Sequence, residues 1–433
     1  MTMTPDMVRE TFRKAACHLV PGVAERNRAI GRGAVEVSGS GAEVTLSDGR
    51  TVLDFGNYAV TLFGHRPARV IEAVHDALDL MPTTTRLLAS PYSADLAARL
   101  VELLDPGRLT RVWFGLNGAD AVEVTLKLAI AQTGRPAILA VENGFHGKSM
   151  GALAATADPE RRKAVSAFLG DARHIPLDAG AVARAAQEAP FAALIVEPVQ
   201  GEGGGRPLPP DLLRRWRADA RAAGAFFISD EIQCGLRRCG SPSLAVDYGL
   251  APDAVLLGKP LGGGVMPLSA AICTSELFAP LLDDPFFHSA TFSGHPLSCA
   301  AGLAALDLLN ELADEFRVVA AALAKGIAEI AQQHPEVVAV GRTTGLLGAL
   351  QFTSSERAGL ATLEAARQGL LLAPCVTDMS VVRVLPPVVA TEQQMATAID
   401  ALHATCRAVA RRTSRSPTPG VPATQDLPSQ FPS

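Results

Sequence analysis

The sequence predicts an α/β fold organised around a largely parallel β-sheet. From about residue 67 onward, short apolar segments alternate with longer segments of helical period. This alternation is typical of βαβ units, in which a helix joins two parallel strands. Several apolar segments end directly in loops rich in glycine and polar residues, where α/β proteins place their sites. The length of 433 residues and the apolar content of 48% allow a large core and two domains.

The individual elements follow from these periodicities. Segments that are apolar throughout predict buried strands at 111–114, 137–141, 192–196, 226–229 and 254–257. Segments with a helical period predict helices at 67–80, 93–104, 119–132, 210–223, 296–312, 315–333 and 391–409. Nearer the N-terminus, one helix is expected to precede short strands. There Asp48-Gly49 separates the segments 42–46 and 51–55, which predicts a β-hairpin.

The same pattern divides the chain into expected domains. Residues 61–312 hold most of the alternation and are expected to form the large domain. Residues 1–60 are expected to join residues 313–411 in a smaller α+β domain. The tail 412–433 is rich in Ser, Thr and Pro and has no apolar period, so we expect it to be disordered.

Composition and charge exclude several classes of function. A formal net charge of −5 gives no electrostatic basis for binding nucleic acid or an anionic membrane. No apolar segment is long enough to span a bilayer and no apolar signal follows Met1, so a cytoplasmic protein is expected. The seven cysteines are scattered and form no CxxC pair, which argues against a metal site or a disulfide framework.

Two residues at the ends of predicted strands carry most of the chemical information. Lys259 closes the apolar segment 254–258 and precedes a glycine-rich turn, so its amine could form an imine with a cofactor carbonyl. Asp230 follows the strand 226–229, where its carboxylate could hold a pyridinium nitrogen. These are the two groups that pyridoxal phosphate (PLP) chemistry needs from a protein. Taken singly, Asp230 could instead cap a helix and Lys259 could be a solvated lysine.

Further residues at strand ends could bind the same cofactor. Gly118 and Ala119 lie where a strand joins a helix, so a phosphate could approach the free N–H groups of the helix. The Phe145 ring, next to His146, could stack on a flat cofactor. The Thr291 hydroxyl could donate to a phosphate. An ordinary βα turn, a core phenylalanine and a simple cap are the structural alternatives.

Charged residues in two other segments could face a substrate. Glu197 and Glu202 belong to a loop that follows a strand, and together they could shape a polar pocket. Arg383 lies among apolar residues, where a cation needs a carboxylate partner from the protein or from a substrate. The alternatives are a solvated loop and a structural ion pair. The order of all these motifs along the chain favours a single site over unrelated features.

Taken together, the motifs resemble those of the class III aminotransferases. The resemblance extends from about Val35 to Leu402. It rests on Phe145-His146-Gly147, Glu197-Pro198-Val199-Gln200-Gly201-Glu202, Asp230-Glu231-Ile232-Gln233, Gly258-Lys259-Pro260-Leu261-Gly262-Gly263-Gly264 and Thr291-Phe292-Ser293-Gly294-His295-Pro296. The family implies a PLP-dependent transferase of fold type I, similar to aspartate aminotransferase, with a mostly parallel central sheet and a smaller α+β domain. It also implies a homodimer with its sites at the interface.

The resemblance implies roles for the residues around the cofactor. Lys259 is similar to the Schiff-base lysine, Asp230 to the partner of the pyridine nitrogen, and Gln233 to the residue that contacts the ring hydroxyl. Phe145 would stack on the ring, beside His146. Gly118 and Ala119 match backbone contacts to the phosphate, and Thr291 matches a threonine that reaches the neighbouring subunit's cofactor.

On the substrate side, Glu202 resembles a gate glutamate that pairs with an arginine, and Arg383 resembles an arginine that holds a carboxylate. Tyr58 corresponds to a residue that lines the substrate pocket. Within the class, segments 145–153 and 262–267 look most like putrescine aminotransferases. Ornithine-type members carry an arginine where this chain has Lys148. Other departures are Asn117 for serine, Asp120 for glutamate and Arg237 for a small residue.

The expected activity is therefore that of an ω-aminotransferase. A terminal amine would give its amino group to the cofactor, forming pyridoxamine phosphate, and an oxo acid would then take that group in the return half-reaction. Three alternatives stay open at this point: an aminomutase that needs no oxo-acid acceptor, an enzyme that aminates an aldehyde intermediate in a specialised pathway, and a PLP-fold protein without enzymatic activity. The physiological donor and acceptor do not follow from the sequence.

Overall fold

The structure is a computed structural model and describes residues 3–413. Its centre is a seven-stranded sheet with the order β4-β12-β11-β10-β7-β5-β6. All neighbouring strands pair in parallel except at β12, which is antiparallel to both β4 and β11. The strand bounds are β4 Arg111–Gly115, β12 Ser269–Cys273, β11 Ala254–Leu257, β10 Phe226–Asp230, β7 Ala193–Val196, β5 Ile138–Val141 and β6 Ala172–Ile175.

This sheet confirms the predicted largely parallel architecture and adds two strands. The five predicted strands are present with small shifts at their ends. The sequence reading missed β6, whose residues Ala172, Arg173 and His174 are only partly buried. It also missed β12, which consists mainly of small residues but is buried along its whole length.

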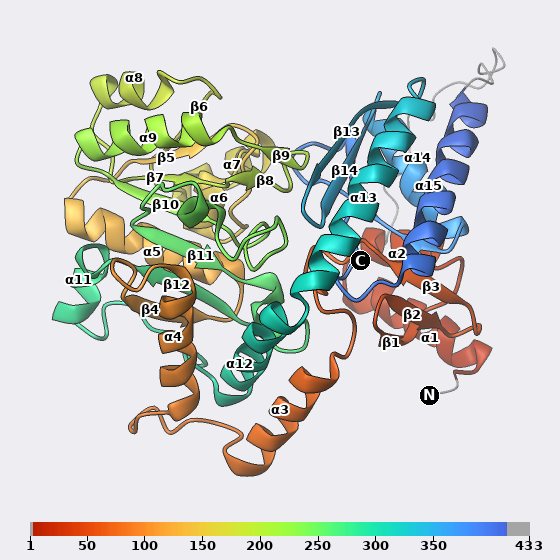
Figure 1. Ribbon diagram of the computed structural model, residues 1–433, viewed down its shortest axis with the longest axis horizontal. Helices are drawn as coiled ribbons and strands as arrows, with labels where there is room; N and C mark the ends of the chain where they lie inside the picture. Colours follow the sequence, from red (N-terminus) through yellow and green to blue (C-terminus); the bar gives the residue numbers. More distant parts are fainter. Residues whose placement is uncertain (1–2, 414–433) are drawn as a thin grey trace, which may run out of the picture.

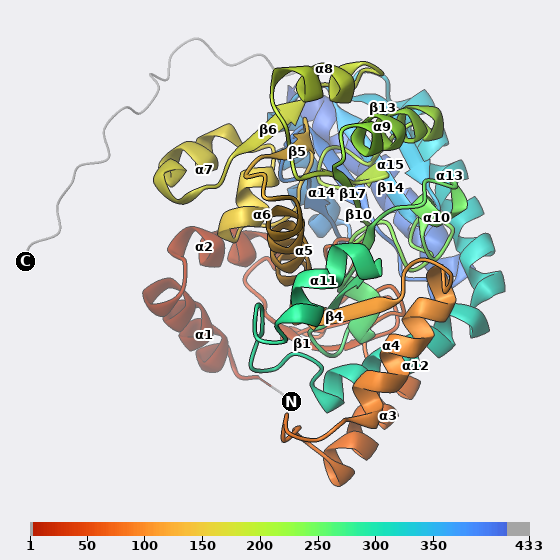
Figure 2. The same cartoon turned by 90° about the vertical axis from the view of Figure 1, so that its left-hand side faces the viewer.

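The sheet is buried on both faces, which explains its uninterrupted apolar strands. Alternate residues of β5 enter separate core clusters, with Ile138 and Ala140 on one face and Leu139 and Val141 on the other. The first face packs against α5 and the second against α8 and α9. Figure 1 shows helices on both sides of this sheet, and Figure 2 shows α8 and α9 at one end of the molecule and α3 and α4 at the other.

The helices agree with the predicted helical segments and add shorter ones. Prolines at the first helical positions of α4, α9 and α12 favour their starts, because proline has no N–H to leave unpaired. The helices packed around the central sheet are α3 Ala68–Leu80, α4 Pro91–Leu104, α5 Gly118–Thr133, α6 Met150–Ala155, α7 Pro159–Ala164, α8 Ala181–Glu188, α9 Pro210–Ala222, α10 Leu244–Asp247, α11 Ser275–Asp283 and α12 Pro296–Glu311.

A smaller region lies beside the large one and combines the two ends of the chain (Figure 1). It contains two four-stranded sheets, β1-β2-β3-β15 and β13-β14-β17-β16. β3 pairs in parallel with β15, so the N-terminal segment shares a sheet with the C-terminal part of the chain. Its elements are α1 Pro5–His18, α2 Pro21–Ile30, β1 Glu36–Ser40, β2 Glu43–Leu46, β3 Thr51–Asp54, α13 Ala313–Gln333, β13 Val338–Thr344, β14 Leu347–Phe352, α14 Ser355–Arg367, β15 Leu370–Leu371, β16 Ala373–Pro374, β17 Val381–Val384 and α15 Glu392–Thr413.

Local predictions in this region had mixed outcomes. The hairpin around Asp48-Gly49 is confirmed, because β2 and β3 pair antiparallel. Two helices, rather than the one expected, precede the strands. The predicted disordered tail begins too early, since Arg412 and Thr413 belong to α15. Residues 414–433 of that tail lie outside the described residues. No helix within residues 3–413 is long and apolar enough to cross a membrane.

Candidate active site

The carboxyl-terminal edge of the central sheet surrounds a cavity of about 440 Å³. Loops that follow β4, β5, β7, β10 and β11 all contribute to it, because these five strands run in the same direction. The cavity is lined by Tyr58, Asn117, Gly118, Ala119, Phe145, His146, Gly147, Lys148, Glu197, Glu202, Asp230, Ile232, Gln233, Lys259 and Val376. Ligands of open α/β sheets bind at this edge.

Lys259 lies directly after β11 and its side chain faces the cavity. Its backbone has a φ of 44°, in the left-handed region that non-glycine residues adopt uncommonly. Burial lowers the pKa of the Lys259 amine, while the charges of Glu202 and Asp230 oppose this change. A lowered pKa increases the neutral, nucleophilic fraction of the amine, which imine formation requires.

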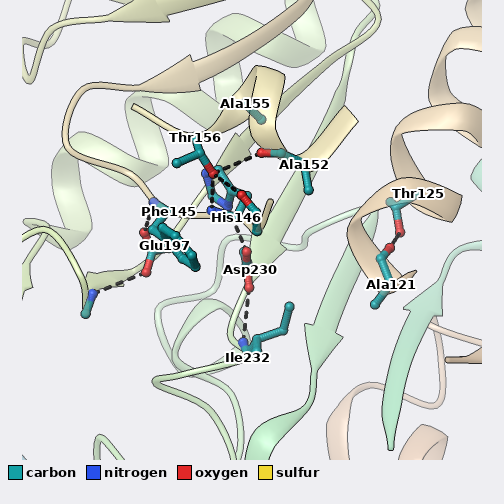
Figure 3. A network of polar contacts seen from close by, with 12 residues as sticks. Ala121, Thr125, Phe145, His146, Ala152, Ala155, Thr156, Glu197, Asp230 and Ile232 are labelled. Atoms are coloured by element: carbon teal, nitrogen blue, oxygen red, sulfur yellow. Dashed lines mark hydrogen bonds and ion pairs between the residues drawn. The ribbon is translucent and has the colours of Figure 1, made fainter. Parts of the chain in front are cut away.

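Asp230 is the last residue of β10, the strand next to β11, and its side chain is buried. Its Oδ2 lies 2.7 Å from Nδ1 of His146, and its Oδ1 accepts a hydrogen bond of 3.1 Å from the backbone N–H of Ile232 (Figure 3). Both oxygens are therefore fixed in direction. Lys259 and Asp230 thus line one cavity from the ends of adjacent strands.

His146 supports Asp230 from the loop after β5. Its backbone N–H donates to the Thr156 hydroxyl at 2.9 Å, and its ring is buried. Burial lowers the pKa of His146, but the hydrogen bond and charge of Asp230, together with the charge of Glu197, raise it above its ordinary value. A protonated His146 would place a positive charge directly beside the Asp230 carboxylate.

Glu197 has a structural role that the sequence did not reveal. It follows β7, and its carboxylate accepts backbone hydrogen bonds from Phe145 at 2.8 Å and from Gly201 at 3.2 Å (Figure 3). Burial raises the pKa of Glu197 to about 7, with His146 opposing this rise and Asp230 adding to it. One carboxylate thereby joins the loop of the Phe145 ring to the loop that carries Glu202.

The N-terminus of α5 forms the opposite wall of the cavity. Asn117 caps this helix by accepting from the Asp120 N–H at 3.3 Å, and the Asp120 carboxylate accepts in return from the Asn117 N–H at 3.2 Å. The two departures from the family pattern at these positions therefore form a reciprocal capping box. A Cβ atom at Gly118 would lie 3.0 Å from the Ile232 side chain, so glycine fits this tight place.

The substrate side of the cavity contains a buried ion pair. Arg383, on β17 of the small region, pairs with Glu202, and its guanidinium lies 5.4 Å from the centre of the Tyr58 ring. Gln233 donates from Nε2 to the same Glu202 carboxylate at 3.1 Å. A Cβ atom at Gly201 would lie only 1.6 Å from the Gln233 side-chain oxygen, so this close packing requires glycine. Arg383 is fully buried behind the cavity lining.

The structure brings most of the proposed site residues together. Arg383 does not itself line the cavity but contacts Glu202, which does. Thr291 lies elsewhere, exposed in the loop between α11 and α12. The lining also includes Ile232 and Val376, which sequence reasoning did not propose. Val376 comes from the small region and carries no chemical signal in the sequence. Arg237, at a position where the family has a small residue, has a left-handed φ of 64°.

These residues fit the chemistry of PLP. A lysine amine, a fixed carboxylate, an aromatic ring and a helix N-terminus with small residues surround one cavity. They provide an imine partner, a counter-ion for the ring nitrogen, a stacking surface and N–H donors for a phosphate.

Comparisons with known proteins agree with this geometry. The family model for class-III aminotransferases matches residues 29–406. The putrescine aminotransferase of Pectobacterium atrosepticum is 34% identical over 419 residues, which cover 91% of this chain and 89% of that protein. The ornithine aminotransferase of Toxoplasma gondii is 27% identical with a TM-score of 0.80, covering 88% of this chain and 92% of that one.

A third relative was solved with the cofactor bound. The amine transaminase of an uncultivated Pseudomonas species, in its PLP-bound form, is 28% identical with a TM-score of 0.79 and covers 87% of this chain and 95% of that one. Like these proteins, the chain has a fold-type-I architecture with a mostly parallel central sheet. The protein belongs to the class III aminotransferases, a family of PLP-dependent enzymes.

Proposed function

We propose that this aminotransferase moves the amino group of a terminal primary amine, such as a diamine or another ω-amino compound, to an oxo acid by ping-pong chemistry. The observation that carries the proposal is that Lys259 and Asp230 line one cavity from the ends of neighbouring strands. The 34% identity to a putrescine aminotransferase supports the amine class of the donor.

Bound PLP supplies an electron sink for the breaking C–H bond and carries the amino group between half-reactions. Asp230, held by His146 and by the Ile232 N–H, would be the counter-ion of the cofactor's ring nitrogen and would favour its protonated form. Phe145 would offer a stacking surface for the ring, and the backbone N–H groups of Gly118 and Ala119, at the start of α5, would hold the phosphate.

Lys259 would hold the cofactor through its amine and, once released from it, would serve as the general base. Burial lowers the pKa of the Lys259 amine, which increases its neutral, proton-accepting fraction. The Lys259 amine would accept the proton from the substrate carbon that bears nitrogen and would release it again later in the reaction. Its reach over the cavity, from a turn followed by three glycines, suits this movement.

The Glu202–Arg383 pair distinguishes the two substrates. While the pair is intact, the guanidinium is neutralised, so the cavity favours an amine that lacks a carboxylate next to its amino group. The oxo-acid acceptor carries such a carboxylate, which competes with Glu202 for Arg383. Tyr58 lies over the guanidinium and lines the same cavity, so its ring would contact a bound substrate.

The proposal is tested with Lys259→Ala and a panel of amines. We expect this variant to lose turnover and the visible absorbance of the lysine–PLP imine while it keeps the wild-type circular dichroism spectrum. The wild-type enzyme should convert terminal amines only when an oxo acid is added. Normal turnover by Lys259→Ala would refute the assignment of the lysine, and acceptor-independent turnover would favour an aminomutase.

We also propose that the enzyme is a homodimer in which Thr291 reaches the partner subunit's cofactor. Thr291 is exposed, lies outside its own cavity, and belongs to the loop between α11 and α12, in which Phe286 is 86% exposed. Mixed dimers of Lys259→Ala and Thr291→Val subunits test this arrangement. If Thr291 acts across the interface, each mixed dimer has one intact site and activity returns. If Thr291 acts within its own subunit, mixing restores nothing.

A further inference from the structure

We propose that this enzyme has a second ligand site, for a phosphate-type dianion, at the amino-terminal edge of the central sheet. The site is a cavity of about 470 Å³ on the opposite edge from the active site. Figure 1 shows its flanking helices α5, α9 and α11 on the left of the large region, away from the small region. This inference stands independently of the substrates proposed above.

Four arginines from three separate segments line this cavity. Arg108 precedes β4, Arg135 precedes β5, and Arg217 and Arg221 lie in the last two turns of α9. They face two acidic residues, Asp253 before β11 and Glu276 at the start of α11. Four cations therefore meet two carboxylates in one small cavity, which leaves an excess of positive charge.

Asp253 is fully occupied by partners within the protein. Its Oδ1 accepts from Arg108 at 2.6 Å and from Arg217 at 3.2 Å. Its Oδ2 accepts from the backbone N–H of Phe227 at 2.8 Å. One carboxylate thus serves two guanidinium groups and cannot neutralise both. Burial lowers the pKa of Arg217, and the charge of Asp253 opposes this, while Arg108 and Arg221 add to the lowering.

Several guanidinium N–H groups remain available to a ligand. Within residues 3–413, neither Nη1 of Arg108 nor Nη1 of Arg217 has a hydrogen-bond acceptor. The Arg221 side chain makes no hydrogen bond to any described residue. Arg135 donates from Nη1 to the carbonyls of Phe191, Ala223 and Gly224, which leaves its other terminal nitrogen available.

Capping of helix C-termini explains only part of this arginine cluster. α5 ends at Thr133 and α9 at Ala222, and arginines near helix C-termini stabilise the free carbonyls there. Arg135 meets that need around the end of α9. The Arg221 side chain donates to no carbonyl within residues 3–413, and Arg108 and Arg217, each with an unused terminal nitrogen, line the same cavity. Planar guanidinium groups bind phosphate oxygens in pairs, and a dianion would balance the excess charge.

The test measures anion binding by the holoenzyme, whose own cofactor phosphate already fills the active-site cradle. Inorganic phosphate, pyrophosphate and a sugar phosphate are titrated calorimetrically into wild type and into Arg221→Gln. We expect saturable, salt-sensitive binding by wild type and a dissociation constant about tenfold weaker in the variant, because one charge-assisted contact is lost. Preference for the sugar phosphate over inorganic phosphate would identify an organic ligand.

Arg215→Gln is the matched control. Arg215 lies on the same helix, is exposed, and pairs with Asp219 outside the cavity. The Arg215→Gln variant should bind the anion like wild type, and both variants should keep normal transamination. Three results would overturn the proposal: no saturable binding by wild type, equal affinity in Arg221→Gln and wild type, or equal weakening by Arg215→Gln. In each case the arginines would serve only to hold the helix ends.

Discussion

The cofactor side and the substrate side of the cavity are built in different ways. On the cofactor side, Asp230 ends β10 and Glu197 follows the neighbouring parallel strand β7, and backbone N–H groups hold both carboxylates. On the substrate side, Glu202 of the large region pairs with Arg383 of the small region. The first arrangement is fixed by the sheet itself, whereas the second depends on how the two regions pack.

This difference suggests a division of labour. A cofactor that stays bound benefits from groups held rigidly in place, because their charges then need no reorganisation during the reaction. Two substrates that alternate in one cavity need a group that can exchange partners. The guanidinium of Arg383 has this possibility, since its carboxylate partner is a side chain and a substrate carboxylate can replace it.

The largest expected effect comes from breaking the cofactor side. Asp230→Asn removes the anion beside the ring nitrogen but keeps the shape of the side chain, so we expect kcat to fall roughly 10³-fold with little change in PLP content. Stopped-flow measurement of each half-reaction checks this, and both should slow. Asp211→Asn, at an exposed carboxylate on α9, is the control. An unchanged rate in Asp230→Asn would contradict the proposed role.

A substitution on the substrate side should have a smaller effect, and mainly on the half-reaction with the oxo acid. Arg383→Gln removes the cation that receives the acceptor's carboxylate, so the KM of the oxo acid should rise roughly 30-fold, while the amine half-reaction changes less. Steady-state kinetics with donor and acceptor varied separately measure the two effects. Arg383→Lys keeps the charge and should recover part of the loss. Equal damage to both half-reactions would show that the two sides are not separable.

The smallest expected effect concerns His174 and the pH dependence of the protein's stability. His174 on β6 lies 3.1 Å from the Ala155 carbonyl through Nε2 and 3.0 Å from the Arg162 guanidinium through Nδ1. Because arginine can only donate, Nδ1 is the acceptor and the ring is neutral. Burial, followed by the charge of Arg162, lowers the pKa of His174 to about 4.

A depressed histidine pKa means that the unfolded chain binds more protons than the native protein at mildly acidic pH. The stabilisation is therefore present above pH 6.5, roughly the pKa of an unfolded histidine, and is lost as the pH falls toward about 4. Allowing for partial exposure of the ring, we expect a loss of about 1 kcal/mol. Urea unfolding of wild type and His174→Gln across this range measures it. In His174→Gln, the free energy of unfolding should fall less steeply between pH 6.5 and pH 4 than in wild type. The same pH dependence in both proteins would contradict the prediction.

Much of the cofactor side could be predicted from the sequence because its signals are local. The buried strands are apolar throughout, since both faces of the sheet are covered, and each is followed at once by its functional residue. The sequence therefore placed Lys259 and Asp230 at the ends of parallel strands, and the pairing of β10 with β11 brings these ends side by side. The weak signals were those of small or partly buried residues, which is why β12 and β6 were missed.

Only the tertiary structure decided which residues far apart in the chain contact each other. His146 meets Asp230 across 84 positions and Arg383 meets Glu202 across 181. The sequence named all four residues, and the family resemblance suggested the second pairing, but only the fold places Glu197 between two loops and gathers four arginines at the other edge. Local periodicity reflects which face of an element is buried. The partner of a buried charge depends instead on how whole elements pack together, and no short segment encodes that.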